Sequence, residues 1–200
     1  MKEIIQFFKT HSGYARMKDL KQAGFHTRNI RALLDNGFIE KIKPGLYRLT
    51  DIPQTDGIPL SFIDVCKSIP KGIICLISAL EYHGLSMINP SEVYVAIPNS
   101  EKPQTIEYPP VRIFYFRERF YDFGIETRKD SYEFIKIYNP EKTICDMFRY
   151  RNKLGEDLAL EGLKNYLKRK DADIAKLHEY AIKCKVKTVM LPYIKAMVIV

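Results

Sequence analysis

Three short amphipathic helical patterns followed directly by a hairpin pattern fill the first fifty residues, and this order restricts the fold more than any other feature of the sequence. Apolar residues recur at helical spacing in each of the three segments. Gly24 and Asn36-Gly37 are typical helix ends, Thr27 is a candidate N-cap, and Pro44-Gly45 is a typical turn. Together these signals predict a winged helix-turn-helix. The predicted helices lie at residues 2–10, at 16–23 and from Thr27 to Asn36-Gly37, and the predicted strands lie at 38–42 and 46–49.

Positive charge is concentrated in the same segment. The whole chain of 200 residues has a formal net charge of +8. Residues 1–50 hold ten Lys and Arg against four Asp and Glu, a balance of +6, whereas the other 150 residues carry only +2. This balance is the footprint of a segment that neutralises phosphates, although a solvated basic face gives the same count. Charge and fold together predict that the segment binds duplex DNA.

The third helix and the hairpin supply the candidate DNA contacts. At 100° per residue, Ile30 and Leu33 face the core, while Arg28 lies opposite with Arg31 beside it. An arginine can donate two hydrogen bonds to guanine, and Asn29 could pair with adenine if the helix is suitably rotated. Lysine and arginine in the hairpin would contact phosphates or the minor groove. The predicted DNA-binding residues are Thr27, Arg28, Asn29, Arg31, Lys41, Lys43 and Arg48.

The chain changes character after a linker at residues 51–59 that is rich in Pro, Asp and Gly. Beyond it, helix and strand patterns mix without a detectable repeat. The chain is therefore expected to be α+β, with a winged helix-turn-helix domain at residues 1–52 and a mixed α+β C-terminal domain at residues 60–200. The predicted helices of the second domain lie at 61–67, 73–83, 140–150, 157–169 and 174–184, its predicted strands at 92–97, 111–116 and 132–138, and its turn-rich segments at 103–110 and 121–130.

Signatures of an enzyme are weak. Glu81-Tyr82-His83, with Asp146 as a distant carboxylate, forms no nucleophile elbow, metal-ligand spacing or phosphate-binding glycine loop. A nuclease would need clustered carboxylates, whereas Glu92 is alone in its strand and Lys136 has no evident acidic companion. We expect no catalytic residue, no cofactor and no metal ion, and therefore a protein that is not an enzyme. The cysteines, which are too far apart for a zinc site and are expected to be reduced packing residues, are Cys66, Cys75, Cys145 and Cys184.

No segment approaches the roughly 20 consecutive apolar residues that a membrane-spanning helix needs. The first ten residues form an amphipathic pattern with charges at Lys2, Glu3 and Lys9, which differs from the uninterrupted apolar core of a signal peptide. We therefore expect a cytoplasmic protein without a membrane partner.

Short motifs along nearly the whole chain resemble those of the AbiEi antitoxins, in the same order and at similar spacing. The N-terminal motifs resemble the winged-helix domain of that family, and they are Gly13-Tyr14-Ala15 through Leu20, residues 28–34, Gly37-Phe38-Ile39 and Pro44-Gly45-Leu46-Tyr47. The downstream motifs resemble its C-terminal domain, and they are Ser78-Ala79-Leu80, His83-Gly84-Leu85, residues 140–146, Arg149-Tyr150-Arg151 and Leu154-Gly155.

The resemblance implies a component of a type IV toxin-antitoxin, or abortive infection, system. Its winged helix would repress its own operon by binding double-stranded DNA at an operator in its promoter. Its C-terminal domain would counteract a nucleotidyltransferase-like toxin encoded beside it, with or without direct contact. The basic DNA-facing residues of the family carry over onto Arg28, Arg31, Lys41, Lys43 and Arg48.

Two other functions remain open at this point. The chain could be a winged-helix transcription factor whose C-terminal domain senses a ligand, or a nuclease-like enzyme that uses the winged helix only to find DNA. The gene neighbourhood separates these readings, because an adjacent nucleotidyltransferase-like gene favours the antitoxin.

Overall fold

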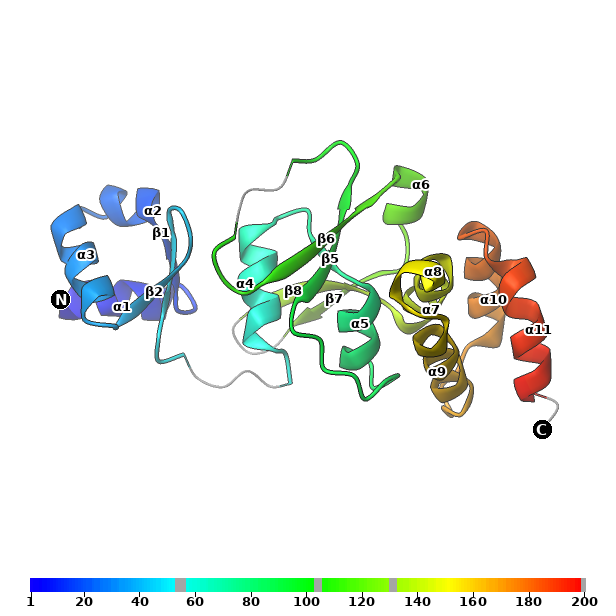
Figure 1. The fold of residues 1–200 in the computed structure, drawn as a ribbon. Coiled ribbons are helices and arrows are strands. Elements are labelled where there is room, and N and C mark those ends of the chain that lie inside the picture. Colours follow the sequence, from blue (N-terminus) through cyan, green and yellow to red (C-terminus); the bar gives the residue numbers. More distant parts are fainter. Residues whose placement is uncertain (53–56, 103–105, 130–132, 199–200) are drawn as a thin grey trace. The chain divides into compact units, whose positions relative to one another are not determined.

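A computed structural model describes residues 1–52, 57–102, 106–129 and 133–198, and within these ranges the chain forms two compact units. Residues 53–56 of the expected linker lie outside the described residues. The expected α+β fold class is confirmed, and its N-terminal part is a winged helix-turn-helix (Figure 1). Unit 1 takes in residues 1–70, 102–111 and 128–135, and unit 2 takes in residues 71–101, 112–127 and 136–200.

The winged helix of unit 1 has its three helices and its hairpin in the predicted order, with ends within one residue of those predicted. A third strand, β1, joins the hairpin to give an antiparallel sheet of order β1-β3-β2. The hairpin turns at Gly45, whose φ of 78° lies in the left-handed region that glycine adopts readily. The elements are α1 (Lys2–Thr10), β1 (Tyr14–Arg16), α2 (Met17–Gln22), α3 (Thr27–Asp35), β2 (Ile39–Lys43) and β3 (Leu46–Leu49).

Two details of the winged helix differ from the sequence predictions. β1 is not predicted, because a strand of three residues between two helices is too short to give an alternating pattern. The N-cap of α3 is His26, which has an extended backbone and accepts no capping hydrogen bond through its side chain. The prediction that Thr27 caps this helix was therefore wrong, and Thr27 is the first residue of α3.

A small apolar core fixes the directions of the three short helices. Ile4 and Phe8 of α1 and Leu20 of α2 are buried against Ile30 and Leu33 of α3. Fully burying one such side chain stabilises the fold by about 1.5–3 kcal/mol relative to leaving it in water. Because the apolar stripe of α3 is held inward in this way, the opposite face of that helix is held toward solvent.

Unit 1 also contains α4 (Leu60–Ser68), which was predicted at residues 61–67. Unlike a surface helix, α4 buries a charged residue, Asp64, together with its apolar residues, and the Asp64 side chain is 0% exposed. A buried carboxylate needs a cation or hydrogen-bond donors around it, so α4 must have polar partners within the unit.

Most residues of a five-stranded sheet, of order β6-β5-β4-β8-β7, belong to unit 2. The short central strand β4 runs antiparallel to β5 and parallel to β8. The strands are β4 (Ile73–Ile74), β5 (Val93–Pro98), β6 (Val111–Phe116), β7 (Ile125–Lys129) and β8 (Phe134–Tyr138). The helices are α5 (Leu76–Tyr82), α6 (Glu118–Tyr121), α7 (Pro140–Arg149), α8 (Arg151–Leu154), α9 (Glu156–Leu167), α10 (Ile174–Lys183) and α11 (Lys187–Val198).

The helix α7 is the centre of unit 2. It begins as predicted after Asn139, whose side chain accepts a hydrogen bond of 3.0 Å from the backbone N–H of Lys142, with Pro140 at the first helical position. Every residue from 141 to 148 is buried, because α5, α9 and α10 all pack against this helix (Figure 1). A helix enclosed on so many sides has no solvent face for its charged residues.

Several elements of unit 2 differ from the sequence predictions. The helix predicted at 73–83 begins only at Leu76, because Ile73 and Ile74 form a strand that pairs on both sides. The turn-rich segment at 121–130 contains β7. The helices α6 and α8 are four residues each and too short to be recognised, and α11 continues the helical end beyond Cys184.

Candidate nucleic-acid interface

The first turn of α3 presents the predicted base contacts to solvent. Thr27, Arg28, Asn29 and Arg31 are all exposed, while Ile30 between them is buried. Within the described part of the chain, neither arginine has a hydrogen-bond or ion-pair partner. A recognition helix meets base edges with the residues near its N-terminus, and this turn offers two guanidinium groups and an amide there.

Two hollows of the winged helix are lined by cations without a carboxylate. The first, of about 250 Å³, lies between α3 and the hairpin, and its lining includes Thr27, Arg31 and Lys41. The second, of about 400 Å³, lies between α2 and the hairpin turn at Gly45. The second hollow suits phosphate oxygens best, because the cations that line it have no carboxylate partner among the described residues to be displaced before the anion binds.

The second hollow brings together residues that the sequence reasoning counted in the charge balance but did not assign to the site. Arg16, Lys18 and Lys21 line it, and all three are exposed and without a partner among the described residues. In helix-turn-helix proteins the helix before the recognition helix crosses the sugar-phosphate backbone. The spacing of Lys18 and Lys21, three residues apart on α2, was the sequence signal for this face.

Arg48 of the hairpin is not on the surface. Its side chain is 8% exposed, and its guanidinium is ion-paired with Asp64 and, at 2.5 Å, with Glu40. Burial raises the pKa of the Asp64 carboxyl, and the charge of Arg48 opposes that rise. The structure therefore corrects the expectation that Arg48 contacts DNA, because the guanidinium is buried and its charge is neutralised inside unit 1.

The two hairpin lysines are also held by other residues of unit 1. Lys43 is 6% exposed and donates a hydrogen bond of 2.7 Å to the Ser68 carbonyl, and burial, with the nearby charge of Arg16, lowers its pKa. Lys41 is part-exposed and lies 2.7 Å from the Glu107 carboxylate. Lys41 therefore remains at the surface, whereas Lys43 has a structural partner and little access to a ligand.

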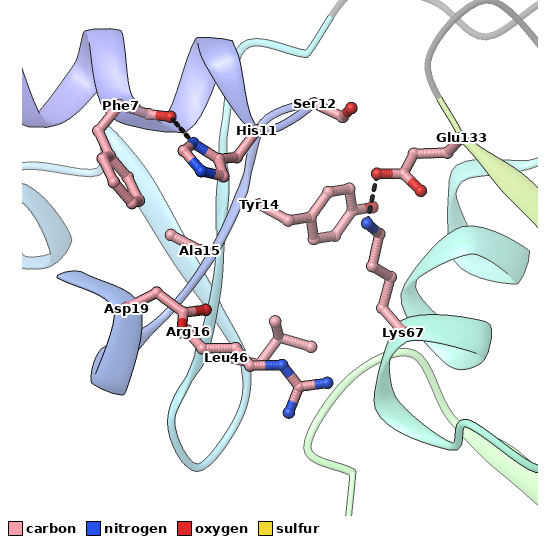
Figure 2. Close-up of a pocket in the computed structure, with 10 residues that line it drawn as sticks. All are labelled: Phe7, His11, Ser12, Tyr14, Ala15, Arg16, Asp19, Leu46, Lys67 and Glu133. Carbon is pink, nitrogen blue, oxygen red and sulfur yellow. Dashed lines mark hydrogen bonds and ion pairs between the residues drawn. The ribbon is translucent and has the colours of Figure 1, made fainter. Parts of the chain in front are cut away.

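A third hollow in unit 1, of about 330 Å³, differs in charge from the other two (Figure 2). Its lining includes the carboxylates of Asp19 and Glu133 as well as Arg16 and Lys67. Lys67 is ion-paired with Glu133, and its Nζ atom lies 5.0 Å from the centre of the Tyr14 ring. Because this hollow contains both signs of charge, it is a less favourable binding site for phosphate than the other two hollows.

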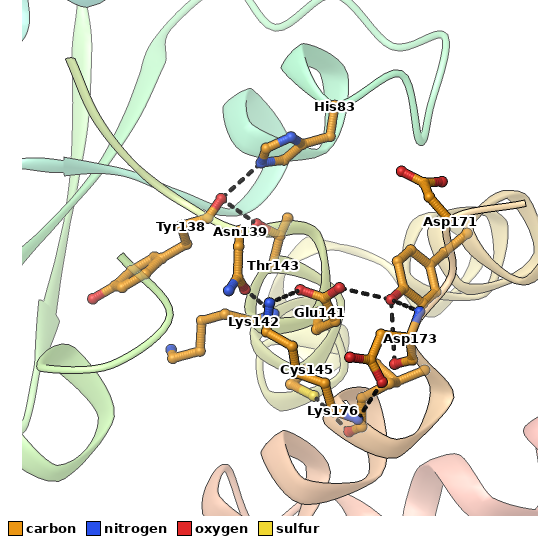
Figure 3. A network of polar contacts seen from close by, with 12 residues as sticks. His83, Tyr138, Asn139, Glu141, Lys142, Thr143, Cys145, Asp171, Asp173 and Lys176 are labelled. Atoms are coloured by element: carbon orange, nitrogen blue, oxygen red, sulfur yellow. Dashed lines mark hydrogen bonds and ion pairs between the residues drawn. The ribbon is translucent and has the colours of Figure 1, made fainter. Parts of the chain in front are cut away.

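In unit 2 the polar side chains around α7 form a network of hydrogen bonds and ion pairs (Figure 3). The Tyr166 hydroxyl donates to Glu141 at 2.7 Å, and Lys176 lies 3.1 Å from the other oxygen of the same carboxylate. His83 lies at the C-terminal end of α5, and its ring nitrogen Nε2 is 2.7 Å from the Tyr138 carbonyl. His83 thus has a structural contact with β8.

The most deeply buried charges of unit 2 belong to α7. Lys142 and Asp146 are both 0% exposed and form an ion pair, and Arg149 lies 3.5 Å from the same carboxylate. Burial raises the pKa of Asp146, and the two cations oppose that rise. Aromatic rings complete the shell around the Lys142 ammonium group, and they are those of Tyr138 at 4.3 Å, Phe123 at 4.8 Å and Phe116 at 5.1 Å.

The residues weighed for an enzyme are not gathered into a site. Asp146 is enclosed with its cations, and Glu92 is paired with Arg112 at 2.8 Å. No group of three or more His, Cys, Asp or Glu in the described ranges is arranged to hold a metal ion. The four cysteines have free thiols, and three of them are buried, in agreement with the packing role expected for them.

The comparison with known families bears on the N-terminal segment. Residues 2–50 match the family model described as transcriptional regulator, AbiEi antitoxin. The N-terminal segment is therefore similar to the AbiEi antitoxin family of transcriptional regulators. The match covers the elements from α1 to β3 and confirms the resemblance found in the sequence motifs there. A search of curated proteins finds no match to the chain.

The matched segment thus carries the exposed first turn of α3 and two cation-lined hollows, while α4 and the rest of the chain follow it. No helix within the described residues combines the length and the apolar character that crossing a membrane requires.

Proposed function

We propose that this protein is a DNA-binding transcriptional autorepressor and the antitoxin of a type IV toxin-antitoxin system. The observation that carries the DNA-binding part is the exposed first turn of α3, together with the hollow between α3 and the hairpin and the hollow between α2 and the hairpin turn, both lined by cations without carboxylates. The family of residues 2–50, antitoxin regulators of transcription, supports the same function. The operator lies in the promoter of its own operon.

In this proposal the residues divide into base-reading and phosphate-binding groups. Arg28 and Arg31 donate to guanine in the major groove, Asn29 pairs with adenine, and Thr27 contacts the backbone at the helix start. The second group binds phosphates on either side of α3, and it comprises Arg16, Lys18, Lys21 and Lys41.

The antitoxin part of the function is assigned to the chain beyond the winged helix. We divide the functions between residues 1–52, which bind DNA, and residues 60–200, which counteract a nucleotidyltransferase-like toxin, by contact or indirectly. The protein acts in the cytoplasm and without catalysis of its own. Co-expression with the neighbouring gene tests this part, since growth must be restored by the full chain and must not be restored by an unrelated winged-helix repressor.

DNA binding is expected to depend steeply on salt, and Lys18 and Lys21 are expected to contribute to the slope. Each neutralised phosphate contributes about 0.9 to the slope of log K against log salt, so Lys18→Gln with Lys21→Gln should reduce the slope by about 1.8. The reduction should be equal on promoter and random duplexes, because phosphates carry no sequence information. Fluorescence anisotropy of the full-length protein across a salt series measures it.

The matched control removes two exposed lysines from unit 2, Lys168→Gln with Lys170→Gln, and should leave the slope unchanged. Equal effects of the two double variants would mean that the total charge of the protein, and not the hollow beside α2, sets the affinity. A flat salt response of the wild-type protein would contradict the proposed function itself.

A further inference from the structure

A buried carboxylate of α4, which lies outside the family-matched segment, contacts the three-stranded sheet that carries the wing. One face of the three-stranded sheet carries a row of polar residues, since Tyr14 of β1 and Glu40 of β2 are both the register partners of Arg48 in β3. Asp64 of α4 reaches this row, accepting a hydrogen bond of 2.8 Å from the Tyr14 hydroxyl and pairing with Arg48. All three strands of the sheet therefore meet at this one group of side chains.

The other contacts of the hairpin do not replace this group. Lys43 donates to the Ser68 carbonyl at the end of α4, and Glu107 both pairs with Lys41 and donates its backbone N–H to the Ile42 carbonyl at 3.3 Å. These contacts hold β2 and the turn. The ion pair of Asp64 and Arg48 joins β3 to α4 through side chains that are both 8% exposed or less.

We infer that Asp64 is a positioning residue for DNA binding: it holds the wing in its DNA-binding position through Arg48, and it does not touch DNA. This inference rests on the proposed function and deepens it, because it gives α4, at the start of residues 60–200, the further role of positioning the wing of residues 1–52 for DNA binding. Arg48 would act inside the protein as the anchor of the wing, while the phosphate contacts come from α2, α3 and Lys41.

The test uses the sign of the charge effect. Asp64→Asn removes a negative charge, which by long-range electrostatics alone strengthens binding to DNA. The inference predicts the opposite, a loss of about tenfold or more in affinity for the promoter duplex, because Arg48 loses a charged partner and the wing is no longer held. Asp51→Asn is the control, since Asp51 is exposed and its substitution changes the net charge equally. It should leave the affinity within about threefold of wild type.

A second readout distinguishes displacement of the wing from unfolding of the protein. In a footprinting experiment with Asp64→Asn, protection of guanines by α3 in the major groove should persist while the protections flanking it, made by the hairpin, weaken. Unfolding would remove both. Circular dichroism melts of each variant accompany the binding data.

The rescue variant keeps the inference falsifiable if Asp64→Asn does not fold. Replacing both buried partners, Arg48→Met with Asp64→Leu, substitutes an apolar contact for the ion pair, an exchange that buried pairs often tolerate. If Arg48 acts only as an anchor, this double variant should bind the promoter duplex within about threefold of wild type.

Three outcomes are decisive. Wild-type affinity of Asp64→Asn would overturn the inference and leave the proposed function intact. A double variant that is as stable as wild type but does not bind the promoter would also overturn it, because Arg48 itself would then contact DNA. Absence of binding by the wild-type protein would overturn the proposed function and this inference with it.

Discussion

The double substitution Arg28→Ala with Arg31→Ala is expected to abolish repression of the operon while the protein stays folded. Both side chains are exposed and make no hydrogen bond or ion pair with the described residues, so their loss should change the free energy of unfolding by less than about 0.5 kcal/mol. Each arginine that reads a guanine contributes about 1–3 kcal/mol of discrimination. Together they should weaken operator binding by roughly 30-fold to 20,000-fold, at about 1.4 kcal/mol for each factor of ten.

The measurement combines a promoter reporter with growth under induction of the neighbouring toxin gene from an independent promoter. The double variant should lose repression and still protect the cells, because its substitutions lie in the winged helix. Arg117→Ala with Arg119→Ala, two exposed arginines of unit 2, is the control for charge and should keep repression. If the first variant lost protection as completely as repression while remaining folded, the division of functions proposed above would be abandoned.

The substitution Lys142→Met is expected to be the most destabilising single change in unit 2. Lys142 and Asp146 are both fully buried, so removing the ammonium group leaves a buried carboxylate with Arg149 alone as its cation. Breaking a buried ion pair from one side costs about 3–5 kcal/mol. Urea unfolding followed by circular dichroism measures the loss, and Lys164→Met, at an exposed position of α9, should have an effect below about 0.5 kcal/mol.

The pH dependence of the Lys142→Met variant gives a second check on the same pair. Burial already raises the pKa of Asp146, and without Lys142 that rise is opposed by less positive charge. A carboxyl whose pKa is higher in the folded than in the unfolded protein holds its proton longer when folded, so stability falls as the pH rises through the window between the two pKa values. The loss caused by Lys142→Met should therefore be larger at about pH 8 than at about pH 5. Combining it with Asp146→Asn should recover most of the stability. A loss that does not change with pH would mean that the charge of Asp146 is not its cause.

The sequence by itself determined the winged helix and the central helix of unit 2, because their signals are local. The apolar stripe of α3 needs only the helical period to place Ile30 and Leu33 inward and Arg28 outward. The start of α7 follows from Asn139 and Pro140, which act through the backbone of their own turn. The charge excess of residues 1–50 is likewise a property of composition, so it predicted DNA as the partner without any knowledge of the tertiary structure.

Tertiary structure alone decided which charges are free. Arg48 and Lys43 look like any basic residues of a hairpin, and their burial depends on Asp64 and Ser68, which come later in the chain and act only once α4 has packed within the unit. The same holds for β4, since an apolar run such as Ile73–Ile74 suits a buried helix as well as a strand until its partners β5 and β8 are in place. Ion pairing and strand pairing join residues far apart in sequence, so no local pattern records them.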